Sequence, residues 1–251
     1  MYSNKKNNFS SFLKSIMAVV FYVLSLNVFS QPKTIYADEN DRIISKSYYQ
    51  KKMNSSIYTG FLYRTDSVVL EKLRLNYYFG KLTPIIRTQF FKFLNHRHQI
   101  DTTKSLLIRY TDTLRTKSEY PIRDVFILNN HEFKDYSVTY KKFISRKKSS
   151  EVYYRRYKRK LVYLDFYLHN NGHPEAYEDL RWYKDYGGLI KKIFHYLKSD
   201  LRTIIIHPDG EFYIESSETK LPFPDLFRKR NWFKHKNQFI KDVKELNNIY
   251  S

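Results

Sequence analysis

Two histidines and a carboxylate lie close together in the segment HNNGHPE, which covers residues 169–175. His169 and His173 are four residues apart, and Glu175 follows two residues later. Imidazole nitrogens and a carboxylate oxygen are ligands that Zn²⁺ accepts, so the segment is a candidate metal site for a metal-dependent hydrolase. The intervening Asn-Asn-Gly favours a turn whose polar side chains bond their own backbone. The sequence leaves both interpretations open, a metal site and an ordinary polar loop.

The densest basic cluster of the chain covers residues 153–160 and interleaves three tyrosines with five basic residues. Cationic side chains bind phosphate or sulfate groups, and aromatic rings can stack on nucleic-acid bases. The cluster leads into an apolar segment, so it could instead be the charged edge of a strand, which discourages aggregation. The candidate anion-binding residues are Arg155, Arg156, Lys158, Arg159 and Lys160.

A third candidate is His207, which stands two residues before Asp209 in a Pro-Asp-Gly turn. A histidine oriented by a carboxylate can act as a general base, but turn chemistry alone explains both residues. Glycine-rich phosphate loops, HExxH and GxSxG are absent from the sequence, and it contains no cysteine. Thiol catalysis, disulfides, cysteine-ligated zinc and iron–sulfur clusters are thereby excluded. We therefore predict no cofactor and favour a protein that is not an enzyme.

The charge balance points to an anionic partner. The chain of 251 residues carries 45 Lys and Arg against 25 Asp and Glu, a formal charge of +20. Such a charge attracts polyanions, whether nucleic acid, acidic polysaccharide, lipid phosphate or an acidic protein surface. A chain rich in Lys, Asn, Ile, Tyr and Phe is also what AT-biased codons produce, so part of the charge could reflect genome composition.

Residues 1–30 have the layout of a secretory signal peptide. Lys5, Lys6 and Lys14 precede a mostly apolar stretch at 16–29, and Ser30 is the expected cleavage position. A retained anchor is the alternative, but the stretch is shorter than the ~20 residues that span a bilayer. Cleavage would leave 42 basic against 25 acidic residues, or +17. We therefore expect a secreted or periplasmic protein without a membrane span, and an envelope polymer or protein as partner rather than nucleic acid. The oligomeric state stays open.

Hydrophobic periodicity predicts strands and helices in alternation. Thr83 and Pro84 are a helix cap and a first-turn proline, and the charged run at 146–150 is expected to end the following helix. Residues 31–80 are expected to form a strand-rich extension, and residues 81–251 an α/β domain. The predicted strands cover 34–36, 57–63, 68–78, 105–110, 125–128 and 161–168, and the predicted helices 84–98, 136–147, 183–198 and 224–246.

The segment TIIIHPDGEFYI at 203–214 is the clearest hairpin signal. A run of β-branched residues meets a Pro-Asp-Gly turn and a second apolar run. The uninterrupted apolar run at 204–206 predicts a strand covered on both faces.

The order of elements, ending in a hairpin and a covering helix, resembles the thioredoxin fold. The chain is similar to small secreted proteins of flavobacteria and their relatives that carry a thioredoxin-like domain. The resemblance lies in the stretches TIYADENDRIIS (34–45), FGKLTP (79–84), SLLIRYTDT (105–113) and IIIHPDGEFYI (204–214). It implies an α/β fold with a thioredoxin-like mixed sheet flanked by helices, preceded by the N-terminal extension.

The resemblance does not extend to the redox chemistry of that fold. Where redox members carry CxxC after a strand, this chain has Thr111-Asp112-Thr113-Leu114, and Leu201-Arg202 stand where those members place a proline. Without a thiolate, disulfide exchange is chemically unavailable. The resemblance therefore implies a scaffold without redox activity.

Overall fold

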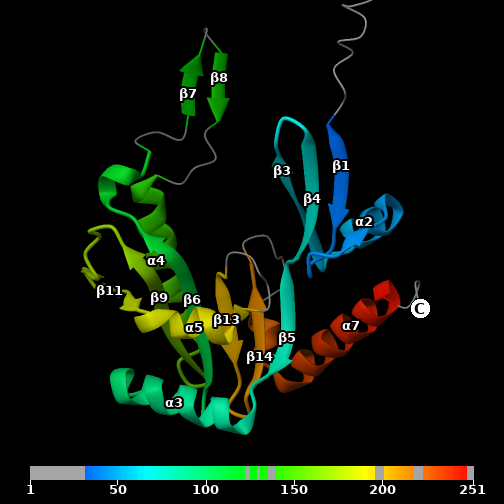
Figure 1. The fold of residues 1–251 in the computed structure, drawn as a ribbon. Helices are drawn as coiled ribbons and strands as arrows, with labels where there is room; N and C mark the ends of the chain where they lie inside the picture. The colour runs from blue at the N-terminus through cyan, green and yellow to red at the C-terminus, as the bar shows by residue number, and fades with distance from the viewer. Residues whose placement is uncertain are drawn as a thin grey trace, which may run out of the picture.

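The computed structural model describes residues 32–121, 125–128, 131–134, 139–195, 201–216 and 223–247 (Figure 1). The signal peptide and cleavage position predicted over residues 1–30 lie outside this range. The described chain forms a mixed α/β structure built around two sheets, which confirms the predicted α/β class. None of the helices within these ranges is long and apolar enough to cross a bilayer.

The larger sheet has six strands in the order β12-β9-β6-β13-β14-β5. Strands β12, β9 and β6 are parallel, whereas β13, β14 and β5 each run antiparallel to the preceding strand in this order. The predicted hairpin forms the pair β13 and β14, whose residues are all buried. The bounds are β5 Tyr77–Lys81, β6 Ser105–Leu114, β9 Leu161–Asn170, β12 Tyr183–Lys184, β13 Thr203–Ile206 and β14 Glu211–Glu215.

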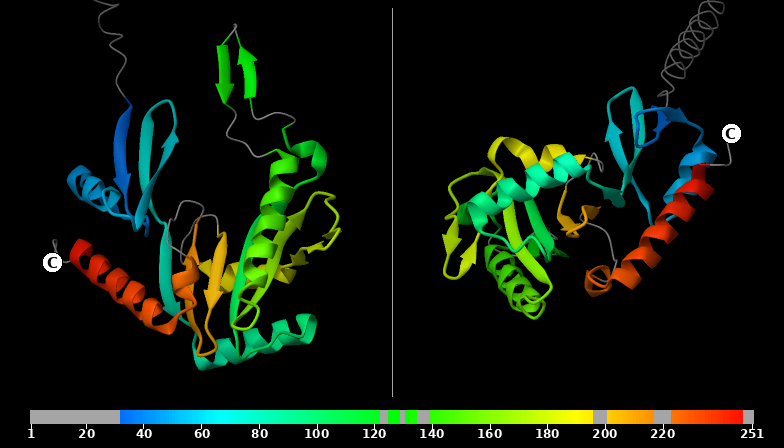
Figure 2. Two further views of the ribbon diagram at one scale, coloured as in Figure 1. Left: turned by 180° about the vertical axis from the view of Figure 1, so that it is seen from behind. Right: turned by 90° about the horizontal axis from the view of Figure 1, so that it is seen from below.

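Helices cover both faces of this sheet. On one face, α3 (Pro84–His98) and α5 (Leu189–Ile193) pack their apolar side chains against residues such as Ile204 and Ile206. On the other face, α4 (Tyr140–Arg155) and α7 (Lys229–Asn247) pack around Leu107, Ile205 and Tyr213 (Figure 2). This two-sided cover explains why β13 is an uninterrupted apolar run.

The smaller sheet has the order β2-β1-β4-β3 and carries α2 beside it. Ser45 caps α2, because its hydroxyl accepts a hydrogen bond from the Tyr48 N–H. Strand β4 ends before Asn76, where the chain passes into β5 of the larger sheet. The bounds are β1 Lys33–Ala37, β2 Ile43–Ile44, α2 Lys46–Met53, β3 Tyr58–Arg64 and β4 Val68–Leu75.

Short elements fill the connections. Strands β7 and β8 pair with each other as a separate hairpin, and so do β10 and β11. The bounds are η1 Lys117–Glu119, β7 Val125–Leu128, β8 His131–Lys134, β10 Ala176–Tyr177, β11 Leu180–Arg181, η2 Tyr186–Gly188 and α6 Phe223–Leu226.

The helix predicted over 183–198 is wrong over most of its described part. Residues 183–184 pair with β9 as strand β12, and α5 covers only Leu189–Ile193. Gly187 and Gly188 both adopt positive φ, which interrupts a right-handed helix. The helix begins after them, where the Asp185 carboxylate accepts hydrogen bonds from two backbone N–H groups of its first turn.

The predicted end of the helix at 136–147 is also wrong, because α4 continues to Arg155. The charged run at 146–150 is part of the helix. Lys147 lies on the buried side of α4, three residues after the buried Ile144 and seven before the buried Tyr154. Its charge is compensated by acidic neighbours, so the helix tolerates it on that side.

Candidate functional site

The five predicted anion-binding residues lie at the end of α4 and in the turn that follows it. Arg155 is the last helical residue, and residues 156–160 form the turn that leads into β9. The turn is closed by hydrogen bonds, among them one from the Lys160 N–H to the Tyr157 carbonyl at 2.8 Å. The cluster is therefore not a strand edge. All five basic side chains are exposed, and none forms an ion pair with another described residue.

A second basic segment stands next to this turn. The rings of Tyr157 and Phe227 lie 5.7 Å apart, which brings the turn beside the start of α7. Arg228, Lys229 and Arg230 are all exposed there. The backbone N–H groups at the start of a helix carry partial positive charge, which adds to that of these side chains. We call the exposed basic residues of 155–160 and 228–230 together the basic surface.

The tyrosines of the cluster face inward rather than outward. Tyr154 is buried and stacks on Tyr163 at 4.9 Å, while Tyr157 packs against Phe227. Burial is the largest cause, and the hydrogen bond to Tyr157 the next, of a rise in the pKa of Tyr153 to about 12. These rings hold the turn in place, and the exposed part of the cluster is its cations. The arrangement suits backbone-like anionic groups better than base stacking.

The structure does not bring His169, His173 and Glu175 together as a metal site. His169 is exposed at the end of β9, whereas His173 is buried against Trp182, with ring centroids 4.9 Å apart. The His173 Nδ1 lies 2.7 Å from the Pro174 carbonyl oxygen, so this nitrogen is the donor. Glu175 accepts a hydrogen bond from the Tyr167 hydroxyl. Throughout the described ranges, no three His, Asp or Glu side chains gather closely enough to hold a metal ion.

His207 is half-buried and contacts Ser105 and Trp232. Its Nδ1 lies 2.8 Å from the Ser105 hydroxyl, and its ring packs edge-on against Trp232 at 4.2 Å. Burial lowers the pKa of His207, although the nearby Asp209 charge acts in the opposite direction. The Asp209 carboxylate accepts a hydrogen bond from the Glu211 N–H at 3.1 Å, as expected for a turn residue.

A buried ionic cluster was not predicted from the sequence. The Lys147 ammonium group donates hydrogen bonds to Asp165, to Glu151 at 3.1 Å and to the Arg181 carbonyl at 3.2 Å. It also lies 5.0 Å from the centre of the Trp182 ring. The only signal in the sequence is Asp165, an acid inside an apolar strand. Lys147 and Asp165 are both buried and hydrogen-bonded to each other, so the role of the cluster is structural.

A second group of polar residues lies on β6, β13 and β14, on the sheet face that also carries Asp165. Arg109 Nη1 donates to the Thr203 hydroxyl at 2.8 Å, and the hydroxyls of Thr203 and Tyr213 both bond the Glu215 carboxylate. Burial raises the pKa of Glu215 despite these bonds and the nearby Arg109 charge. Glu215 is 5% exposed, so this group also serves the fold.

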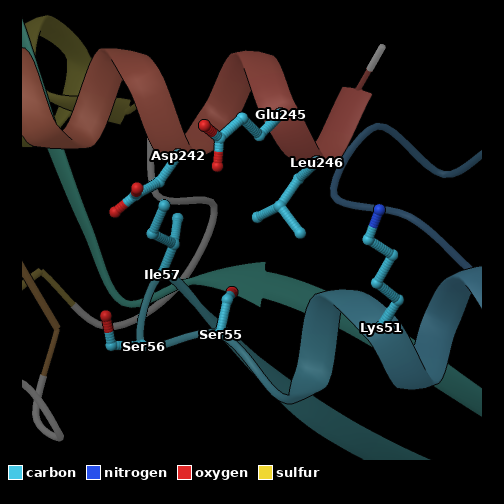
Figure 3. A pocket seen from close by; sticks show the side chains of 7 residues that line it. All are labelled: Lys51, Ser55, Ser56, Ile57, Asp242, Glu245 and Leu246. Atoms are coloured by element: carbon cyan, nitrogen blue, oxygen red, sulfur yellow. The ribbon is translucent and has the colours of Figure 1, made fainter. Parts of the chain in front are cut away.

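A groove of about 670 Å³ lies between α2 and the C-terminal half of α7 (Figure 3). Ile57 and Leu246 form its apolar part, and Asp242 and Glu245 supply carboxylates from α7. The predicted candidate residues do not line it. Its lining residues are Lys51, Ser55, Ser56, Ile57, Asp242, Glu245 and Leu246.

Comparisons of this chain with protein-family models, with curated proteins and with solved structures found no match.

Proposed function

We propose that the protein is a secreted or periplasmic binding protein without redox activity, and that its basic surface holds an anionic partner at the cell envelope. The observation that carries the proposal is the convergence of two exposed basic segments. The turn after α4 and the start of α7 are far apart in sequence, and the contact between Tyr157 and Phe227 sets them side by side. Cations concentrated from two elements attract a polyanion more strongly than the same charges spread over the surface.

The strand order supports a thioredoxin-like arrangement for this protein. Strands β6 and β9 are parallel and are joined by α4, and the antiparallel β13 and β14 continue the sheet on the other side of β6. Helix α7 then covers the sheet. Residues Thr111 to Leu114, which stand in place of CxxC, belong to β6 itself. The thiol chemistry of that fold is absent here, which is consistent with the proposed binding role.

The test measures retention on an immobilised sulfated polysaccharide such as heparin. We expect the purified protein to bind and to elute with salt. The triple variant Arg155→Gln, Arg156→Gln, Lys158→Gln should bind at least ~10-fold more weakly and show a smaller salt dependence, by about one unit of logarithmic slope per lost contact.

The matched control removes three exposed basic residues elsewhere, with Lys46→Gln, Arg64→Gln and Lys92→Gln. Both variants have the same net charge. Equal losses in the two variants would mean that binding follows overall charge and not this surface, and the proposal would fail. N-terminal sequencing of exported material tests the location, and we expect a mature chain that begins at Gln31.

A further inference from the structure

The solvent side of α7 carries an apolar pair that the core does not account for. The buried side of the helix holds Trp232, Phe239 and Leu246, spaced by seven residues. On the exposed side, Phe233 is 43% exposed and Ile240 is 39% exposed. These two are also seven residues apart, so they lie on one side of the helix about 10 Å from each other. They contribute apolar area to the surface without packing the sheet.

Exposed basic residues flank this apolar pair. By helical spacing, the exposed Lys229 lies on the side of the line between Phe233 and Ile240 that is nearer the buried residues of the helix. On the other side lie the exposed Arg230, Lys234, Lys241 and Lys244, of which Lys241 also pairs with Glu245 at 3.8 Å. The outer face of α7 therefore presents two apolar side chains beside a row of cations, with Lys229 on their other side.

This pattern matches the surface of an anionic bilayer. A helix with an apolar strip and a basic border lies in the membrane interface, with the apolar groups at the acyl boundary and the cations near lipid phosphates. A soluble polyanion would engage only the cations and would gain nothing from Phe233 and Ile240. The apolar pair therefore distinguishes lipid phosphate from a polysaccharide.

The outer face of α7 is continuous with the basic surface, because Lys229 and Arg230 belong to both. Figure 2 shows α4 and α7 across the same face of the larger sheet, so the turn after α4 and α7 can approach one plane together. The basic turn would then add its charges to those of the helix.

We propose that α7 lies on an anionic lipid bilayer with Phe233 and Ile240 inserted at the level of the headgroups. The inference rests on the proposed function and narrows its anionic partner to lipid phosphate. Because the chain has no cysteine, a single introduced cysteine gives a unique position for a label.

The experiment attaches an environment-sensitive fluorophore to Ile240→Cys and mixes the protein with phosphatidylglycerol vesicles. We expect a blue shift, and none with phosphatidylcholine vesicles. The control label stands at Ile85→Cys, a residue 70% exposed on α3, which covers the opposite face of the sheet. It should not shift. Binding to phosphatidylglycerol without a shift at position 240, or equal shifts at both positions, would overturn the inference.

A second measurement compares variants by co-sedimentation with the same vesicles. Phe233→Ser with Ile240→Ser should weaken vesicle binding at least ~10-fold. Ile85→Ser with Leu62→Ser removes two exposed apolar residues elsewhere and should leave binding unchanged. All four positions are solvent-exposed, and far-UV circular dichroism checks that the variants fold.

The two proposals fail in different ways. Retention on heparin without vesicle binding would overturn the lipid assignment and leave the basic surface as a polyanion site. If the purified protein neither bound heparin nor bound the vesicles, the proposed function itself would be overturned. The serine variant of α7 should keep its retention on heparin, because it removes no charge.

Discussion

At the scale of single residues, the cost of buried charge decides which side chains matter for the fold. Lys147 is 7% exposed and uses its three N–H groups on two carboxylates and a carbonyl. An ion pair of this kind adds little net stability compared with apolar residues of the same volume. Removal of one partner, however, leaves an uncompensated charge in the core. The cluster therefore stabilises the position of α4 on β9 only while it is complete.

We expect Lys147→Met to lower the free energy of unfolding by about 3–5 kcal/mol, because Asp165 would stay buried without its cation. Urea unfolding measures the change. The double variant Lys147→Met, Asp165→Leu should recover most of the loss. A single variant as stable as the wild type would show that the ion pair does not act as a unit.

Glu215 makes stability depend on pH in a predictable direction. Its pKa is raised above the usual value of 4.5 by burial. Between the pKa of Glu215 in the unfolded chain and its raised pKa in the folded protein, the folded protein holds a proton that the unfolded chain has released. Stability therefore falls as pH rises through that range. Glu215→Gln removes this contribution. Its stability relative to the wild type should therefore be higher near about pH 8 than near about pH 4, as measured by urea midpoints. The reverse order would contradict a raised pKa.

Single residues were predictable from the sequence where their role is local. The turn role of Asp209 and the caps at Ser45 and Thr83 follow from chemistry within four residues. The partner of Asp165 was not predictable, because Lys147 is eighteen residues away and reads as part of a solvated charged run. Local spacing also did not reveal that the candidate metal ligands His169, His173 and Glu175 lie apart. The ring of His173 turns into an aromatic cluster that no local spacing reveals.

At the scale of elements, glycine determines how β5 joins the larger sheet. Gly80 pairs with Phe212 of β14, and a Cβ atom at position 80 would lie 2.3 Å from a ring carbon of Phe212. Phe212 has no exposed surface and packs against Phe194, so it has little freedom to move away. The edge strand therefore needs a residue without a side chain at this position.

Gly80→Ala should lower the free energy of unfolding by about 1–3 kcal/mol through this overlap. In the Gly80→Ala background, Phe212→Leu should cost less than it does in the wild type, because the smaller side chain relieves the clash. Denaturant unfolding of the four proteins in this cycle gives the coupling. Additive effects of the two substitutions would contradict the contact.

Helices with strong start signals were predicted well, and those without them were not. Thr83 and Pro84 define the start of α3, and the helix runs to His98 as expected. The apolar spacing after residue 183 favours a helix equally, yet pairing with β9 takes residues 183–184 into the sheet. Hydrophobic periodicity indicates that one side of a segment is buried, but it does not indicate which strand or helix packs against that side.

At the scale of the whole molecule, the two sheets share one core. Ile57 and Leu73 of the N-terminal part belong to the same buried cluster as Tyr213 and Trp232 of the larger sheet and α7. No local pattern predicts this shared core or the pairing of β5 with β14. Both depend on contacts between distant parts of the chain, so the α/β class was predictable and the sheet order was not.

Leu73→Ala should therefore destabilise the larger sheet as well as the smaller one. Leu73 is fully buried, and the cavity should cost about 2–5 kcal/mol. In a Trp182→Phe background, the fluorescence of Trp232 reports on α7. Its urea midpoint should fall together with the midpoint seen by far-UV circular dichroism. An unchanged Trp232 midpoint would mean that the sheets unfold independently.

The pairing of β5 with β14 also sets a limit on when the protein can fold. Tyr77 lies opposite Glu215, more than one hundred residues later in the chain. A ribosome adds about 5–20 residues per second, so several seconds pass between the synthesis of β5 and the synthesis of β14. The nascent chain cannot complete the sheet before β14 emerges. During that interval the chain remains a substrate for any machinery that acts on unfolded polypeptides.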